Sequence, residues 1–166
     1  MLSILCKNPA FGIFTKETNF AKTAIQKEVV RTPQEEQAFI SEMKEKDNMY
    51  TVIQVENRVV GISRLIRGEL EMKQHVALFR TWLASEAQGK GIGSKIMEYT
   101  LSWAEIHKLH KVVLTVFSGN MVATKLYQKY GFTIEGIQKE QVMLNGEYQD
   151  EIYMGYFVNE KIPQPF

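Results

Sequence analysis

The strongest constraint on the fold of this 166-residue chain is a glycine-rich stretch, Gln88-Gly89-Lys90-Gly91-Ile92-Gly93. It separates an apolar run, Leu78–Ala84, from a segment with the periodicity of an amphipathic helix. A strand that ends in closely spaced glycines and then opens a helix leaves a row of backbone N–H groups without intrahelical partners. Glycine lets a ligand approach those groups, and the helix dipole favours an anion there. The stretch therefore indicates either an ordinary strand-to-helix turn or a diphosphate site.

A second segment, Asn120 to Phe132, favours the diphosphate interpretation. Asn120 and Tyr127 are seven residues apart, so they share one face of a helix. Ala123 lies between them on that face, which brings an amide, a small surface and a phenol into line. Such a face suits an extended ligand that carries amide groups and a reactive end. The alternative is a tyrosine packed in the core with its hydroxyl at the rim.

The first half of the chain predicts one helix and three strands. Thr32-Pro33-Gln34-Glu35 has the cap, proline and acidic residue of a helix start, and the helix should run to about Lys46. Two strands, Tyr50–Val55 and Val59–Ile66, should flank a tight turn, and a polar loop should lead to a third strand, His75–Ala84. The buried side of the helix should consist of Ala38, Phe39 and Met43.

The second half predicts two helices and three strands. The helix after the glycine-rich stretch should bury a face with helical spacing, made of Ile96, Tyr99, Trp103 and Ile106. Lys111–Phe117 is nearly all apolar, which predicts a central strand buried on both faces. A further helix should follow and end at Gly131. The last two strands should be Thr133–Leu144 and Glu147–Val158, which meet at the hairpin signal Asn145-Gly146.

The order of these elements predicts an α+β domain with a mixed, twisted sheet of six or seven strands and helices on both faces. Only two helices follow the third strand and the chain closes on a hairpin, which argues against a doubly wound sheet. The glycine-rich stretch lacks the Gly-Lys-Ser/Thr ending of a P-loop. Its Gly-x-Gly-x-Gly spacing also differs from the Gly-x-Gly-x-x-Gly of dinucleotide-binding folds.

Length and composition are typical of a single globular domain over residues 1–166, with an atypical lead-in (1–31) and a loose tail (159–166). A formal net charge of +1 gives no electrostatic case for nucleic acid as the partner. No stretch approaches the ~18 apolar residues of a membrane span. No cluster of Cys and His indicates a metal site. The single cysteine, Cys6, fits a reducing compartment, so we expect a cytoplasmic protein.

Together the two segments resemble the GCN5-related N-acetyltransferase (GNAT) superfamily. The family's first signature, Gln/Arg-x-x-Gly-x-Gly/Ala, is matched by Gln88–Gly93, and its second by Asn120 followed by Tyr127-Gln-Lys-Tyr130-Gly131-Phe132. The stretch Asn145–Met154 is similar to the final hairpin of small bacterial members that acetylate amino acids or unspecified amines. The resemblance covers about Thr32–Val158, whereas residues 1–20 depart from the usual first strand and helix.

The resemblance implies the GNAT fold, in which acetyl-CoA lies in a V-shaped splay between the strands at His75–Ala84 and Lys111–Phe117. Its pantetheine amides would pair with the backbone of Trp82, Leu83 and Ala84. Its pyrophosphate would sit on the N–H groups of Gln88, Gly89, Lys90, Gly91, Ile92, Gly93 and Ser94. Asn120, with Ala123 on the same face, would hold the pantetheine near the thiol. Tyr127 would protonate the departing thiolate after a neutral amine attacks the thioester.

The sequence departs from the family at the general base. Many members place a glutamate on the strand before the pyrophosphate loop, but the strand at His75–Ala84 contains no carboxylate. His75 itself, a chain of water molecules, or Asp150 or Glu151 on the last strand are the candidates that remain.

The function implied is acetyl-CoA-dependent N-acetylation of a small primary amine such as an amino acid, without a metal and with dimerisation left open. Two alternatives stay open at this point. One is a non-catalytic module that binds or senses acyl-CoA, and the other is an enzyme that acetylates a protein N-terminus or a lysine. Acceptor specificity in this fold comes from variable loops, here 17–31, 67–74 and 144–147.

Overall fold

A computed structural model of the chain describes residues 2–5 and 32–158. Seven strands form one sheet in the order β1-β2-β3-β4-β5-β7-β6, and β4 and β5 are the parallel pair among antiparallel neighbours. The strands are β1 (Leu2–Leu5), β2 (Met49–Val55), β3 (Arg58–Arg67), β4 (Val76–Leu83), β5 (Lys111–Phe117), β6 (Thr133–Leu144) and β7 (Glu147–Phe157). The helices are α1 (Pro33–Glu45), α2 (Ile92–Ile106) and α3 (Met121–Lys129), with 3-10 turns η1 (Glu71–Lys73) and η2 (Ser85–Ala87).

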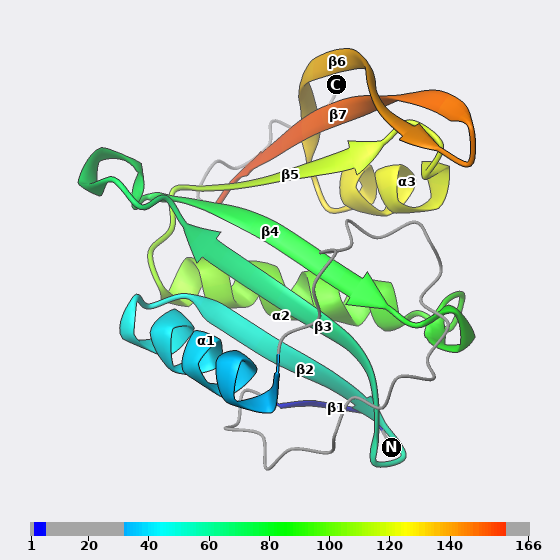
Figure 1. The fold of residues 1–166 in the computed structure, drawn as a ribbon. Coiled ribbons are helices and arrows are strands. Elements are labelled where there is room, and N and C mark those ends of the chain that lie inside the picture. The colour runs from blue at the N-terminus through cyan, green and yellow to red at the C-terminus, as the bar shows by residue number, and fades with distance from the viewer. Residues whose placement is uncertain (1, 6–31, 159–166) are drawn as a thin grey trace, which may run out of the picture.

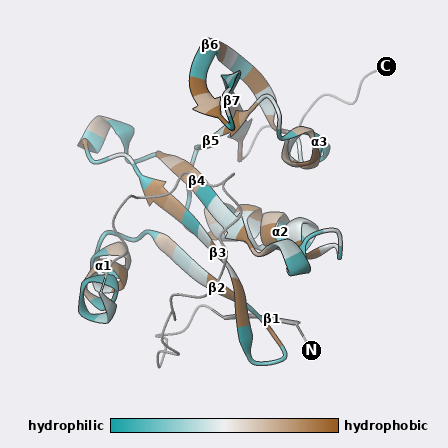
Figure 2. Cartoon of the chain, turned by 45° about the vertical axis from the view of Figure 1, so that its right-hand side comes forward, coloured by the Kyte–Doolittle hydropathy of each residue, from teal (hydrophilic) through white to brown (hydrophobic). Residues whose placement is uncertain are grey.

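The helices cover both faces of the sheet, as the sequence predicts. Figure 2 shows α1 on one side of strands β2 to β4 and α2 on the other, with α3 beside β5 and β7. The main core lies between the sheet and the α2 and α3 layer, and its fully buried members include Leu65, Phe79, Met97, Leu114 and Met154. The α+β prediction with a mixed sheet is therefore confirmed.

Helix α1 begins with the capping box expected from the sequence. Thr32 Oγ1 accepts the N–H of Glu35 at 3.3 Å, and the Thr32 N–H donates to Glu35 Oε2 at 2.7 Å. Met43 is buried and the Phe39 ring lies edge-on to Tyr50 at 6.1 Å, but Ala38 is exposed. The prediction that Ala38 is buried was wrong, because Ala38 lies beside the apolar stripe that Phe39 and Met43 form at i, i+4 spacing.

Helix α2 is rotated relative to the face predicted for it. The buried residues are Ile92, Ile96, Met97, Thr100 and Ala104. Ile106 is 75% exposed, and Tyr99 and Trp103 are only half-buried. The small residues Thr100 and Ala104 face the sheet because they allow close approach, as the 3.4 Å contact of Thr100 with the Ser63 hydroxyl illustrates. Ile96 is buried as predicted and Tyr99 and Trp103 pack against the core, so the prediction was wrong for Ile106 and missed the small buried residues.

Strand β5 is central, as its near-continuous apolar sequence predicts. Val112, Leu114 and Val116 are buried and the alternate residues are half-buried. The closing hairpin also turns where expected, with positive φ at both Asn145 (54°) and Gly146 (84°), the conformation of a two-residue type I′ turn.

Strands β4 and β5 pair only where they begin. Residues 76, 77 and 78 of β4 pair with residues 111, 112 and 113 of β5. Beyond that point β4 runs on to Leu83 and β5 to Phe117 without pairing to each other, and Figure 1 shows the two ribbons diverging. The V-shaped splay that the family resemblance implies is therefore present.

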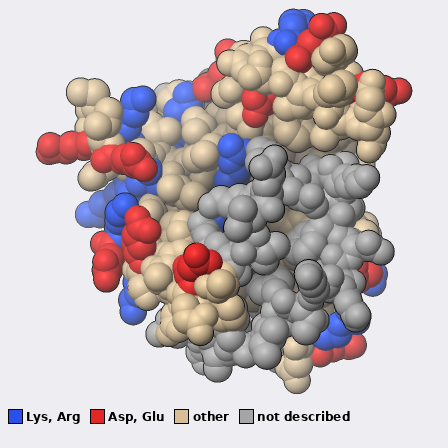
Figure 3. Space-filling view, viewed as in Figure 1, with Lys and Arg blue, Asp and Glu red and all other residues tan. Residues whose placement is uncertain are grey.

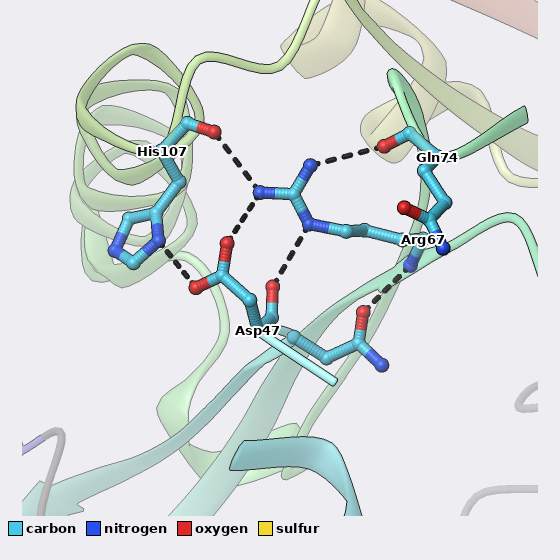
Figure 4. Close-up of polar contacts among 5 residues, drawn as sticks. Asp47, Arg67, Gln74 and His107 are labelled. Carbon is cyan, nitrogen blue, oxygen red and sulfur yellow. Dashed lines mark hydrogen bonds and ion pairs between the residues drawn. The ribbon is translucent and has the colours of Figure 1, made fainter. Parts of the chain in front are cut away.

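The paired end of the splay is tied together by Arg67, the last residue of β3 (Figure 4). Its Nη2 donates to Asp47 Oδ2 at 2.6 Å and to the His107 carbonyl at 2.9 Å, and its Nη1 donates to the Gln74 carbonyl at 3.0 Å. Its Nε donates to the Asp47 carbonyl at 3.0 Å, and His107 Nδ1 lies 2.7 Å from Asp47 Oδ1. This cluster joins the end of α1, the η1 loop and the end of α2 at one point.

Candidate functional site

The glycine-rich stretch follows η2 and ends where α2 begins. Gly89 has φ of 70°, and Gly91, the N-cap of α2, has φ of 75°, values that favour glycine. A Cβ added at either position would meet nothing within 4 Å. Positive φ and open space, rather than tight packing, therefore account for these two glycines.

Six consecutive backbone amides, from Gly89 to Ser94, point to no protein acceptor among the described residues. The next amide, that of Lys95, donates to the Gly91 carbonyl at 3.4 Å and starts the helical pattern. The Gln88 amide is different, since it donates to the Ser85 carbonyl at 3.2 Å. The Gln88 side chain donates to the Leu83 carbonyl at 3.0 Å. Gln88 thus stabilises the turn through two hydrogen bonds, and the backbone amides without an acceptor among the described residues begin at Gly89.

The free edge of β4 is defined by the alternation of an antiparallel strand. The Ala84 N–H donates to the Val60 carbonyl of the β3 side at 2.8 Å. Because alternate residues direct their N–H and C=O groups to opposite edges, Trp82 also faces β3, whereas Leu83 faces the splay. Of the three backbone positions proposed for pantetheine, the structure turns Leu83 toward the splay and turns Trp82 and Ala84 away.

Tyr127 lies on α3 at the other side of the opening. Its ring is 8% exposed and packs edge-on against Phe79 at 6.1 Å, the first residue of β4 beyond its pairing with β5. Burial raises the pKa of the Tyr127 phenol to about 12, although the nearby Arg80 charge opposes the shift. The phenol is therefore protonated at neutral pH, and its hydroxyl donates to no acceptor among the described residues.

The two sequence motifs are brought side by side. Asn120 caps α3 by accepting the Ala123 N–H on its Oδ1 at 3.2 Å, which leaves its Nδ2 donor unused within the described residues. Ala123 is half-buried against the core. A Cβ at Gly93 would lie 3.0 Å from Leu126 Cδ2, so Gly93 allows the start of α2 to approach α3 closely.

The geometry separates the candidates for the general base. His75 precedes β4 at the paired end of the splay, where its carbonyl accepts the N–H groups of His110 and Lys111. At about 3.3 Å per residue, β4 places Leu83 ~25 Å from His75. That distance is too long for proton transfer at the opening.

The two carboxylates of β7 also differ. Asp150 accepts a hydrogen bond from Lys139 Nζ at 2.8 Å and from the Glu140 N–H at 3.0 Å, contacts that lower its pKa. Asp150 therefore closes the β6–β7 hairpin. The Glu151 carboxylate instead accepts the Tyr153 hydroxyl at 3.3 Å.

The sequence did not lead us to expect Arg80 among the candidate site residues. Its Nη1 donates to Thr115 Oγ1 at 3.1 Å, so its side chain reaches from β4 to β5 across the splay. The available signal was a charged residue inside an otherwise apolar strand.

Several negative findings apply to the described part of the chain. Within residues 2–5 and 32–158, no helix has both the length and the apolar character that a bilayer crossing requires. No three His, Cys, Asp or Glu side chains of that part are grouped so that they could hold a metal ion. On the face drawn in Figure 3, Lys and Arg lie among Asp and Glu rather than in a separate basic patch.

The fold and both motifs agree with a direct comparison of sequences. Residues 16–132 match the model of the Acetyltransferase (GNAT) family, so the chain belongs to the GNAT family. It is 34% identical over 101 residues to the L-amino acid N-acetyltransferase AaaT of Escherichia coli, which covers 60% of this chain and 62% of that protein. It is 32% identical over 105 residues to the spermidine N(1)-acetyltransferase of Vibrio cholerae, covering 63% of this chain and 60% of that protein.

The chain thus matches about three fifths of the length of these curated relatives. Among solved structures, a Salmonella typhimurium protein determined with its cofactor acetyl-CoA superposes with a TM-score of 0.75 at 17% identity. The match covers 86% of this chain and 83% of that one, which establishes the shared fold.

Proposed function

We propose that the protein transfers the acetyl group of acetyl-CoA to a small primary amine. The observation that carries this proposal is the line of donors along the splay that have no acceptor among the described residues. The amides of Gly89 to Ser94 lie at one end, the Leu83 N–H faces the gap, and the protonated Tyr127 phenol lies on the opposite wall. These groups match, in order, a diphosphate, a thioester oxygen and a leaving sulfur.

The coenzyme would fit this line as follows. Its pyrophosphate would accept from the amides of Gly89 to Ser94, aided by the dipole of α2. Its pantetheine would run along the free edge of β4 toward Leu83. Asn120 Nδ2 would donate to a pantetheine carbonyl while Oδ1 keeps its capping bond, and Ala123 leaves room for the chain. The Salmonella typhimurium relative with acetyl-CoA supports this assignment of the cofactor.

The chemistry needs no covalent enzyme intermediate. The neutral amine attacks the thioester carbon, and the Leu83 N–H stabilises the negative oxygen of the tetrahedral intermediate. The carbon–sulfur bond then breaks, the Tyr127 hydroxyl donates its proton to the departing sulfur, and the amine loses a proton to solvent or to a carboxylate. Products are an N-acetyl amine and CoA. Because burial raises its pKa, the phenol holds its proton at neutral pH and can donate it as negative charge develops on the sulfur, and the phenolate then regains a proton from solvent.

The test is release of the CoA thiol across a panel of amines, compared with Tyr127→Phe. We expect kcat to fall roughly 10²- to 10⁴-fold in the variant, with the affinity for acetyl-CoA nearly unchanged. Tyr130→Phe is the matched control on the same helix, because the Tyr130 hydroxyl donates to Glu98 at 2.9 Å instead. A Tyr127→Phe enzyme as fast as the wild type would remove Tyr127 from the mechanism.

The missing carboxylate on β4 favours a second candidate, a module that binds acyl-CoA without turnover. Calorimetry distinguishes the two, because tight acetyl-CoA binding without CoA release on any amine or peptide would support the module. An acceptor on a protein N-terminus or lysine is the third outcome of the same panel. A cytoplasmic location and a homodimer remain predictions that fractionation and light scattering would test.

A further inference from the structure

Arg80 is a charged group at the splay that the proposed transfer does not use. It is half-buried, and its Nη1 donates a hydrogen bond to Thr115 Oγ1 at 3.1 Å. Its other N–H groups donate to no acceptor among the described residues. Arg67 is a useful contrast, because its Nε, Nη1 and Nη2 all donate to protein oxygens. Donors of a half-buried guanidinium that lack a protein partner must be completed by a ligand or by water.

Arg80 and Tyr127 lie on opposite faces of the sheet at the splay, because Arg80 follows Phe79 in β4 and Tyr127 packs on Phe79. Thr115 is directly opposite Tyr153 in the register of β5 and β7, so Arg80, Thr115 and Tyr153 share one face of the sheet. Glu151, two residues from Tyr153, is on that face too and accepts the Tyr153 hydroxyl at 3.3 Å. The Arg80 charge acts on both phenols, since it opposes the raised pKa of Tyr127 and of Tyr153.

An acceptor that enters the unpaired part of the splay from the face of Arg80 would bring its nitrogen to the thioester and leave the rest of the molecule on the side of Arg80. A carboxylate in that position can accept two parallel hydrogen bonds from the guanidinium fork. A second ammonium in that position would meet the like charge of Arg80. Glu151 meanwhile offers a carboxylate on the same face to the incoming ammonium. The arrangement is complementary to a molecule that carries both charges.

We propose that Arg80 binds the carboxylate of the acceptor, so that the substrates are α-amino acids rather than polyamines. This inference rests on the proposed transferase function and deepens it. It distinguishes between the acceptors named for the two relatives, an L-amino acid and spermidine. Arg80 acts as a specificity-determining residue, and the chemistry of transfer stays with Tyr127 and the Leu83 amide.

The experiment compares matched substrates: L-alanine, L-methionine and L-phenylalanine, each with its primary amide, and spermidine. Rates are corrected for the fraction of neutral amine, since amidation also changes the amine pKa. We expect kcat/KM to be roughly 10- to 100-fold higher for each acid than for its amide, the range of a charge-assisted hydrogen bond. Spermidine should be poorer than the best amino acid.

Substitutions at Arg80 and Thr115 then test which residue causes the preference for the acid over its amide. Arg80→Gln keeps a donor for Thr115 but removes the charge, so KM for the acids should rise until acid and amide are equal, while kcat changes little. Arg80→Lys should restore part of the preference. Thr115→Val is the control that keeps the charge, and it should retain the preference for the acid. Unchanged acetyl-CoA affinity by calorimetry shows that each variant is folded.

Three results would overturn the inference: spermidine exceeding every amino acid, amides matching their acids in the wild type, or Arg80→Gln slowing acids and amides equally. Failure of the transferase function would look different, because no amine would then release CoA. Calorimetric titration of the CoA-loaded protein with each amino acid and its amide tests the same carboxylate contact without turnover. Equal or absent binding of the two ligands there would also reject the role of Arg80.

Discussion

The two ends of the β4–β5 splay use the same kinds of polar group in opposite ways. At the paired end, Arg67 donates through all three of its nitrogens, and the His75 carbonyl accepts two backbone amides. At the open end, Arg80 makes its single described hydrogen bond to Thr115, and the amides of Gly89 to Ser94 have no protein acceptor in the described part of the chain. Within the described residues, the polar groups of the paired end have protein partners, whereas those of the open end have donors without them.

This difference distinguishes polar groups that stabilise the fold from polar groups that are available to a ligand. Buried polar groups are normally satisfied, so a group left without a protein partner marks a place that a ligand or water must complete. Two arginines near the same pair of strands would look equivalent in the sequence. Their hydrogen bonds assign Arg67 to the framework and Arg80 to the proposed acceptor site.

The largest expected effect on stability is at the paired end. Arg67→Met removes donors to Asp47, Gln74 and His107, and we expect the free energy of unfolding to fall by about 3 kcal/mol in urea titrations. The affinity of the folded variant for acetyl-CoA should be unchanged. Lys46→Met is the control, because its ion pair with Glu42 is more than half exposed and its loss should change the free energy of unfolding far less.

An Arg67→Met protein that keeps its stability but binds acetyl-CoA poorly would contradict the comparison. It would mean that the paired end also shapes the binding site.

The open end should show its own pH dependence through Tyr127. Its pKa is raised from 10.0 to about 12, so the neutral phenol contributes stability that is complete below pH 10 and is lost as the pH rises toward 12. The loss should reach up to about 2.5 kcal/mol in the wild type and be absent from Tyr127→Phe. Urea unfolding at pH 9 and pH 11 should show about half of this loss, because pH 11 lies midway between the two pKa values. Parallel losses in both proteins would place the effect elsewhere.

The glycine-rich stretch offers a matched pair of substitutions. Gly91→Ala should raise the Kd for acetyl-CoA roughly 10- to 50-fold, because a side chain at φ of 75° disturbs the row of amides. Gly146→Ala introduces similar strain at φ of 84° in the β6–β7 turn and should leave the Kd unchanged. Calorimetry on both variants separates the two effects, and an equal change in Kd would show that backbone strain alone is responsible.

The smallest effect is expected at the start of α1. Thr32→Ala removes the hydroxyl of the capping box and should lower the free energy of unfolding by about 1 kcal/mol. Neither the Kd nor kcat should change. A larger loss than that of Arg67→Met would show that α1, rather than the paired end of the splay, limits the stability of the domain.

Local signals explain what the sequence could predict. The capping box at Thr32, the terminator Gly131 at φ of 89° and the turn at Asn145-Gly146 each depend on a few neighbouring residues, and all lie where expected. The glycine-rich stretch is of the same kind. Its conformation is a property of the glycines themselves.

Register and packing explain what the sequence could not predict. The direction of the Leu83 amide depends on which edge of β4 faces β3, and that is fixed by the register between residues 61 and 83. The buried face of α2 depends on the fit of Thr100 against Ser63. Arg80 gains its significance only when β5 brings Thr115 beside it. Each of these facts involves residues far apart in the chain.

The brevity of the β4–β5 ladder has a mechanical consequence. The lobe of β1 to β4 and the lobe of β5 to β7 share a ladder of three residue pairs, and beyond it they meet through side-chain contacts such as Phe79 with Tyr127 and Arg80 with Thr115. A coenzyme lodged between the lobes would touch both and act as a bridge. Saturating coenzyme should therefore raise the melting temperature by mass action, and both lobes should show the same rise.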